Sequence, residues 1–235
     1  MATSASAEEF FGAGSPFGAI SGWVAQDGGG VTKTKERASV LGADGDELRH
    51  VDWNEQHSTS CVYIPADSVT SGNLTIPSVG GILNGYVIDS VQVAYSQDVP
   101  KMTVTGHKAI LKTSGAYTGL RTYSPTIDLP FVALGVPDAL GHVACDGARS
   151  ATYELAMNHV AETGGQGYLV GANNHDGTET LTIESVCAIT PDTNDSDAAN
   201  WTATNDAQTK SNSAATVNSL TLVKHISHDS TGSGS

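Results

Sequence analysis

The chain of 235 residues has few cysteines and few aromatic residues. Its three cysteines, Cys61, Cys145 and Cys187, are odd in number and far apart in sequence, which argues against a disulfide framework or a Cys-x-x-Cys zinc site. We interpret them as small buried side chains of a protein made in a reducing compartment. Because aromatic residues are only 6% of the chain, the core must consist mainly of Val, Leu, Ile and Tyr.

Basic residues are also scarce. The chain has 11 Lys and Arg and 25 Asp and Glu, which gives a net charge of −14. Charged residues nevertheless total only 15% of the chain. That total is below the usual ~25%, so the surface must be rich in Ser, Thr, Asn and Gly. An acidic surface argues against tight nucleic-acid binding, which needs clustered Lys and Arg. The same repulsion would let a nucleic acid slide past without sticking.

No stretch of the sequence approaches the roughly 18 apolar residues of a membrane span. Residues 1–9 also lack the basic region and apolar core of a secretory signal. We therefore expect no membrane span, and synthesis in the cytoplasm.

Catalytic and cofactor-binding motifs are lacking as well. The segment Gly14–Gly18 does not match a nucleophile elbow, and Gly28–Gly30 is not followed by the Lys-Ser/Thr of a phosphate-binding loop. His225 and His228 are close in sequence, but three positions along a strand place them on opposite faces. The acidic clusters at 44–47 and 192–197 do not fit a twelve-residue calcium loop. The sequence predicts a protein that is not an enzyme and that has no cofactor or metal.

What the sequence does contain is alternation of apolar and polar residues. In the run from Gly80 to Lys108, Val91, Val93 and Tyr95 fall on one face of a strand, and Met102 and Val104 alternate in the same way after a turn. Side chains of a strand alternate faces, so this run predicts a half-buried hairpin.

Further short strands are expected where turn-forming residues interrupt similar patterns. The turns are Asp27–Gly30, Ala43–Asp46, Asn54–Glu55 and Asn173–Gly177. The strands are expected at 20–26, 31–41, 47–53, 58–64, 150–160, 167–171 and 179–189. Helical periodicity is hard to find. The predicted fold class is all-β, an antiparallel β-sandwich or barrel with long loops and at most one short helix.

The chain divides into four parts by composition. Residues 1–19 form a small, Gly/Ser-rich N-terminal arm, and residues 20–190 form the β domain, with a Pro-rich excursion at 111–147. Residues 191–218 are a polar loop that is poor in aliphatic residues. Residues 219–235 are the last strand and a flexible tail.

Four aromatic residues stand out as candidates for an assembly interface. Phe10, Phe11 and Phe17 stud the N-terminal arm, and Trp201 stands alone in the polar loop. The three rings of the arm either cap the chain's own core or dock on a neighbouring subunit, and the sequence leaves both interpretations open.

The order of strands and turns resembles a known family. Residues 37–55, followed by 58–64, give a strand, an Asp-Gly turn, a second strand and an Asn-Glu turn before a core strand. Tyr153–Val160 and Thr178–Val186, around Asp176-Gly177, are similar to a second sheet. This pattern, over about half of the chain, resembles the tail-tube proteins of tailed bacteriophages.

The resemblance implies a virion subunit that assembles with itself into hexameric rings. The rings would stack into a tube whose inner wall is a continuous β-barrel and which conducts DNA without binding it specifically. Other virion proteins would be the further partners, and the protein would be made in the host cytoplasm and reside in the virion. An acidic lumen agrees with the charge of the chain.

Three other functions stay open at this stage. A capsid-decoration or head–tail connector protein would share the β-rich composition. A carbohydrate-binding or receptor-binding β-sandwich would need exposed aromatic residues along a groove, with Trp23, Trp53 and Trp201 as the tryptophan candidates. An enzyme also remains an alternative, because catalytic groups in β folds need not be adjacent in sequence.

Overall fold

The computed structural model describes most of the chain between Ser15 and Ile226. The described residues are 15–27, 29–66, 75–95, 100–109, 120–125, 143–144, 148–163, 169–186, 190–191, 201–210 and 216–226. Phe10, Phe11 and most of the predicted 111–147 excursion lie outside this part of the chain.

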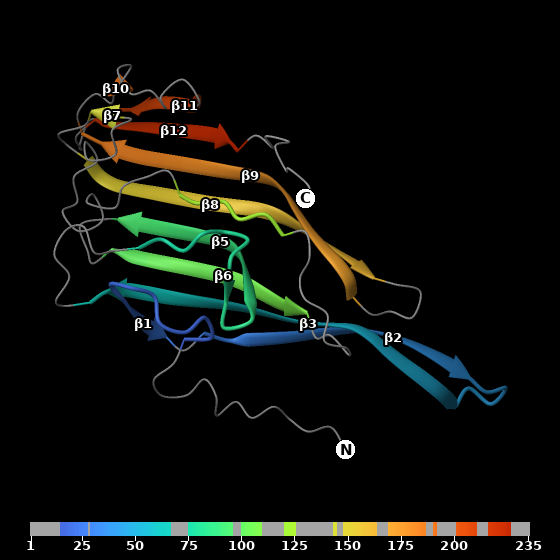
Figure 1. The fold of residues 1–235 in the computed structure, drawn as a ribbon. Coiled ribbons are helices and arrows are strands. Elements are labelled where there is room, and N and C mark those ends of the chain that lie inside the picture. Colours follow the sequence, from blue (N-terminus) through green and yellow to red (C-terminus); the bar gives the residue numbers. More distant parts are fainter. Residues whose placement is uncertain are drawn as a thin grey trace, which may run out of the picture.

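Twelve strands make up the described fold (Figure 1), and all of their pairings are antiparallel. They are β1 Trp23–Asp27, β2 Val31–Leu41, β3 Glu47–Pro65, β4 Ile82–Leu83, β5 Tyr86–Tyr95, β6 Lys101–Ala109, β7 Val143–Ala144, β8 Ala148–Thr163, β9 Leu169–Ser185, β10 Thr190–Pro191, β11 Thr202–Thr209 and β12 Val217–His225. The all-β, antiparallel fold class is thus confirmed.

Ten of these strands form one sheet, in the order β1-β3-β6-β5-β8-β9-β12-β11. Strand β2 pairs with β3 beside β1, and β4 pairs with β5, while β7 and β10 form a separate pair. The large sheet is open and does not close into a barrel. The described residues contain no helix.

Two predicted turns lie inside continuous strands, and these predictions were wrong. Asn54–Glu55 is within the 19-residue strand β3, and Asn173–Gly177 is within the 17-residue strand β9. Irregularities in the pairing take the place of both turns, one opposite Thr34/Glu36 and the other at Ala156/Asn158. Asp176 adopts a φ of 53° there, a conformation that Asp tolerates better than most residues.

The predicted polar loop at 191–218 also needs correction. It contains strand β11, whose eight residues are all exposed. This strand pairs with β12 from Thr202↔Val223 to Thr209↔Val217, and β12 itself begins at Val217. A strand that buries no side chain has no hydrophobic period, which is why the sequence pattern missed it.

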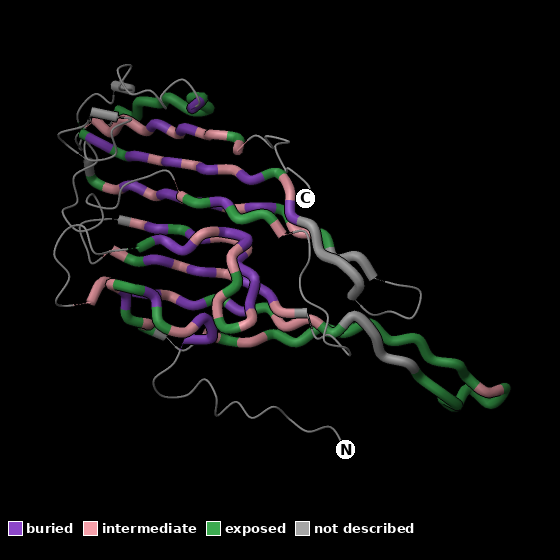
Figure 2. The backbone as a smooth tube through the Cα atoms, viewed as in Figure 1, coloured by how far each residue is buried: buried purple, intermediate pink, exposed green. Residues whose placement is uncertain are grey.

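The core lies against one face of the sheet, and Figure 2 shows the buried positions along the strands. Alternate residues of the central strands are almost completely buried, and they follow each other across the strands in register. One such row runs Tyr63, Met102, Val93, Tyr153, Leu181 and Leu222. The predicted alternation of Val91 and Val93 against Gln92 is confirmed.

Three segments cover part of this apolar face. Phe17 packs edge-on against Tyr86, with ring centroids 5.8 Å apart, and Ser15 is hydrogen-bonded to the Tyr63 hydroxyl. Val79 and Tyr123, from two other segments, exchange backbone hydrogen bonds of 2.9 and 2.8 Å. Burial in this layer raises the pKa of the Tyr63 hydroxyl, although the hydrogen bond from Ser15 opposes the shift.

The two longest hairpins extend beyond the sheet at the same end. One row of paired residues crosses the sheet from Ser60 through Thr105, Ser90, Ala156 and Thr178 to His225. Residues of β3 before this row and residues of β8 after it run in the same direction, so both extensions leave the sheet together (Figure 1). We call residues 35–55 the long hairpin, because β2 and β3 there pair only with each other among the described strands.

Candidate functional site

Among the strands that the structure describes, the outer ones form the two edges of the sheet. Strand β11 forms one edge and is exposed along its whole length. Strands β1 and β2 together form the opposite edge, along the outer side of β3, and every residue of β2 after Val31 is exposed. Exposed strand edges present unpaired backbone N–H and C=O groups, so each of them can pair with another strand.

The face of the sheet opposite the core is polar and rich in hydroxyl groups. Ser90 and Thr105 are hydrogen-bonded at 2.6 Å across β5 and β6, and Thr182 and Thr221 are 3.3 Å apart across β9 and β12. The same face carries further side chains of this kind, namely Ser60, Thr103, Thr152, Thr180 and Ser219. All of these residues are at least partly exposed, so the face is hydrated over its width.

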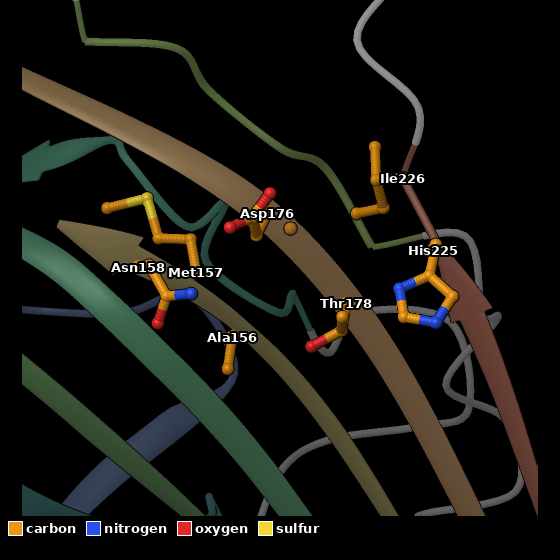
Figure 3. A pocket seen from close by; sticks show the side chains of 8 residues that line it. Ala156, Met157, Asn158, Asp176, Thr178, His225 and Ile226 are labelled. Atoms are coloured by element: carbon orange, nitrogen blue, oxygen red, sulfur yellow. The ribbon is translucent and has the colours of Figure 1, made fainter.

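A cleft of about 490 Å³ opens at the end of the sheet where β8 and β9 continue as a hairpin (Figure 3). Its lining residues are Ala156, Met157, Asn158, Asp176, Gly177, Thr178, His225 and Ile226. The volume lies within the range of about 300–1,000 Å³ that is typical of ligand-binding clefts.

The irregular pairing of β8 with β9 shapes this cleft. It places Asn158 and Asp176 beside the more apolar Met157 and Ile226. Gly177 allows the close packing, because a Cβ atom there would lie 3.2 Å from the Tyr123 ring and 3.4 Å from Ile226. The backbone N–H of Ile226 donates to the Gly177 carbonyl at 2.8 Å, which holds the chain after β12 against β9.

Asp89, His107 and His159 form a small cluster close to the same end of the sheet. Nδ1 of His107 lies 2.8 and 2.9 Å from the two carboxylate oxygens of Asp89, and the His107 and His159 ring centroids are 3.9 Å apart. Burial lowers the pKa of His159, and the electrostatic effect of the neighbouring His107 adds to this shift while Asp89 opposes it. His107 is only 7% exposed, so a dissolved substrate cannot reach its ring.

A carboxylate and an ammonium group lie within the otherwise apolar core. Glu179 is completely buried, and its Oε1 accepts a 2.6 Å hydrogen bond from the Tyr153 hydroxyl. Nζ of Lys224 lies 3.5 Å from the other oxygen of Glu179 and 5.8 Å from the centroid of the Trp201 ring. The ion pair joins β8, β9 and β12 to the residue that precedes β11. Buried charges of this kind must be paired to be tolerated.

Two of the four aromatic residues predicted for an assembly interface, Phe17 and Trp201, lie in the described part of the chain. Phe17 is 2% exposed and Trp201 is 9% exposed, and both belong to the chain's own core. For Phe17 this is the core-capping alternative. Phe10 and Phe11 are outside the described residues.

Two of the three tryptophans that were candidates for a glycan groove are buried. Trp23 is buried, and its indole N–H donates to the Thr75 carbonyl at 3.1 Å. Trp201 is buried as well, and the side chain of Trp53 is not described.

Sequence reasoning missed the buried Glu179, although a signal for it was present. Glu179 is in phase with Leu181 and Ile183 on one face of β9, so the alternation alone places a carboxylate in the core. The cleft had no comparable signal, because it depends on an irregular pairing between distant residues. Within the part of the chain that the structure describes, no cluster of three His, Cys, Asp or Glu residues is arranged to hold a metal.

No family model matches the chain, and a search of curated proteins finds no match either. Of the described residues, none belongs to a helix that is long and apolar enough to cross a membrane.

Proposed function

We propose that the chain is a self-assembling virion subunit of the tail-tube type, whose copies join edge to edge into a ring around a lumen that conducts DNA. The observation that carries this proposal is the open antiparallel sheet of ten strands, whose β11 edge and β1/β2 edge are paired with no further strand among the described residues. Strand β11 of one copy pairs with the β1/β2 edge of the next. A closed ring satisfies both edges, whereas a single copy leaves them open to uncontrolled pairing.

The two faces of the sheet support the same proposal. The apolar face is already covered within the chain at residues such as Val93 and Tyr153, which are 0% exposed. The hydroxyl-rich face is the one left to line a lumen, and Glu154 and Glu184 lie on it. Carboxylates and hydroxyls do not attract a phosphate backbone, so DNA passes without being held.

Electron microscopy of the purified chain in negative stain, at rising concentration, tests the ring. Rings or stacked tubes with a hole wide enough for duplex DNA are the expected result. Discrete particles that never form rings at any concentration would overturn the proposal and direct attention to a decoration or connector role, which binding to virions would then test.

A pair of adjacent proline substitutions tests the edge pairing. In an antiparallel pair, successive residues point their N–H groups alternately toward the partner strand and away from it. Asp206→Pro and Ala207→Pro in β11 therefore remove one N–H that faces β12 and one that faces outward. Thermal melting shows which substitution removes the outward N–H, because that variant keeps the stability of the parent. We expect this variant to form no rings. If it still forms rings, β11 is not the joining edge.

A further inference from the structure

The hairpin formed by β8 and β9 leaves the sheet at a defined point. The last pair that joins β8 to β5 is Ser90↔Ala156, and β4 takes the place of β8 beside the preceding residues of β5. From Asn158 onward, β8 pairs only with β9 among the described strands. We call residues 158–163 and 169–175 the β8–β9 extension, and Figure 1 shows it leaving the sheet as a two-stranded ribbon. A two-stranded ribbon is only marginally stable alone, so side-chain contacts with the rest of the fold must hold it in place.

Two side chains that are paired across the extension make such contacts. Asn174 is completely buried, and its Oδ1 accepts a 2.6 Å hydrogen bond from the backbone N–H of Arg121. His159, directly opposite Asn174, lies against the ring of His107 on β6, with ring centroids 3.9 Å apart and a tilt of 45°. The contact of Asn174 uses neutral groups and does not depend on pH, whereas the contact of His159 joins two titratable rings.

The two imidazole rings are in different environments. Nδ1 of His107 lies 2.8 and 2.9 Å from the carboxylate oxygens of Asp89, so a proton on His107 has a counter-charge. Nδ1 of His159 is buried and has no hydrogen-bond partner among the described residues. A protonated imidazole donates from both nitrogens, so this position suits the neutral form of His159. The pKa of His159 is lowered accordingly, mainly by burial.

Other charged groups lie close to this contact along the same elements. Among the residues whose side chains the structure describes, they are Lys108, Arg121, His175 and Asp176. Lys108 and Arg121 add positive charge. Asp176 is 65% exposed and lies 3.4 Å from Nε2 of His175, so water and its neighbour screen its charge. Within this described set, Asp89 is the anion that faces the two rings, and one carboxylate cannot neutralise two imidazolium groups.

We propose that the contact between His107 and His159 is a pH-sensitive switch, which holds the β8–β9 extension against β6 at neutral pH and releases it in mildly acidic solution. In the released state His159 is in water and binds a proton with its ordinary pKa of about 6.5, whereas the attached state disfavours this proton. A falling pH therefore favours release. Asn158 and Asp176 flank the contact and line the cleft, so release also changes the cleft. The switch does not depend on the proposed ring, since it uses neither edge of the sheet.

Hydrogen exchange of backbone amides in the full chain, measured by mass spectrometry of its peptides, tests this switch. At pH of about 5.5, a released His159 is protonated about ten times as often as it is neutral, so opening should increase by up to about tenfold relative to pH of about 7.5. After correction for the intrinsic exchange rate at each pH, we expect the extension to lose protection about three- to tenfold. Residues 151–156 of β8, which pair with β5 and β9, should keep theirs.

Two variants identify the group responsible. His159→Phe keeps an aromatic ring against His107 but cannot bind a proton, so its extension should stay equally protected at both pH values. His175→Phe is the matched control, because it removes another histidine of the extension, 40% exposed, and should keep the full pH response. Thermal melting verifies that both variants are folded.

Three results would overturn the inference. In the parent chain, they are an extension equally protected at both pH values, or a loss of protection spread evenly over the sheet, which indicates global unfolding. The third is a pH response that survives His159→Phe.

Discussion

At the scale of single residues, stability depends on the ion pair between Glu179 and Lys224 in the core. Glu179 is completely buried, so replacing Lys224 with Met leaves a carboxylate without its cation. We expect a loss of about 3 kcal/mol in the free energy of unfolding, measured by urea denaturation. Lys101→Met, at an exposed strand end, is the control and should change stability by less than about 0.5 kcal/mol. Equal effects of the two substitutions would contradict the role of the pair.

His159 gives the fold a dependence on pH. Because its pKa is lowered in the folded chain, the unfolded chain binds the proton first as the pH falls below about 6.5. The contribution of neutral His159 to stability is therefore fully present above this pH, and it decreases as the pH falls toward the lowered pKa. His159→Asn should lose less stability than the parent between pH 7.5 and 5.5, as measured by urea midpoints at each pH. The same pH dependence in both chains would show that His159 is not responsible.

At the scale of the elements, strand β6 depends on a glycine for its contact with the covering segment. A Cβ atom at Gly106 would lie 2.8 Å from Cε1 of Phe17 and 2.5 Å from the Val87 carbonyl oxygen. Gly106→Ala should therefore cost about 1–3 kcal/mol of stability by overpacking. Gly30→Ala meets no atom within 4 Å and is the matched control in a thermal melt. A Gly106→Ala chain as stable as this control would show that the covering segment does not pack as described.

Some of the strands and turns could be predicted from the sequence, and others could not. Strand β2 was predicted at its observed bounds, and alternation located β5, β6 and β8, because one face of each of these last three is buried. The turn chemistry at Asn54–Glu55 was misleading, since Asn also occurs where a long strand is irregular. Strand β11 and the cleft depend on pairing with distant residues, and local patterns do not record such pairing.

At the scale of the whole molecule, charge opposes association. Copies with a net charge of −14 repel each other, and salt screens this repulsion over about 10 Å at 0.1 M. We expect the average mass in solution, measured by light scattering, to rise when the NaCl concentration is increased about tenfold, from about 0.05 to 0.5 M. Association that weakens with salt would indicate instead that ion pairs between copies dominate.

The projection of the long hairpin beyond the sheet also bears on how the protein can vary. Removing one residue from β3 inside the sheet would move every following side chain to the opposite face and expose the core. Beyond Gln56 no such constraint applies, because only β2 must match. Paired deletions or insertions near the tip would shorten or lengthen the reach by about 3.3 Å per residue pair and leave the sheet untouched. The hairpin is thus an adjustable spacer, and its length can evolve separately from the fold that carries it.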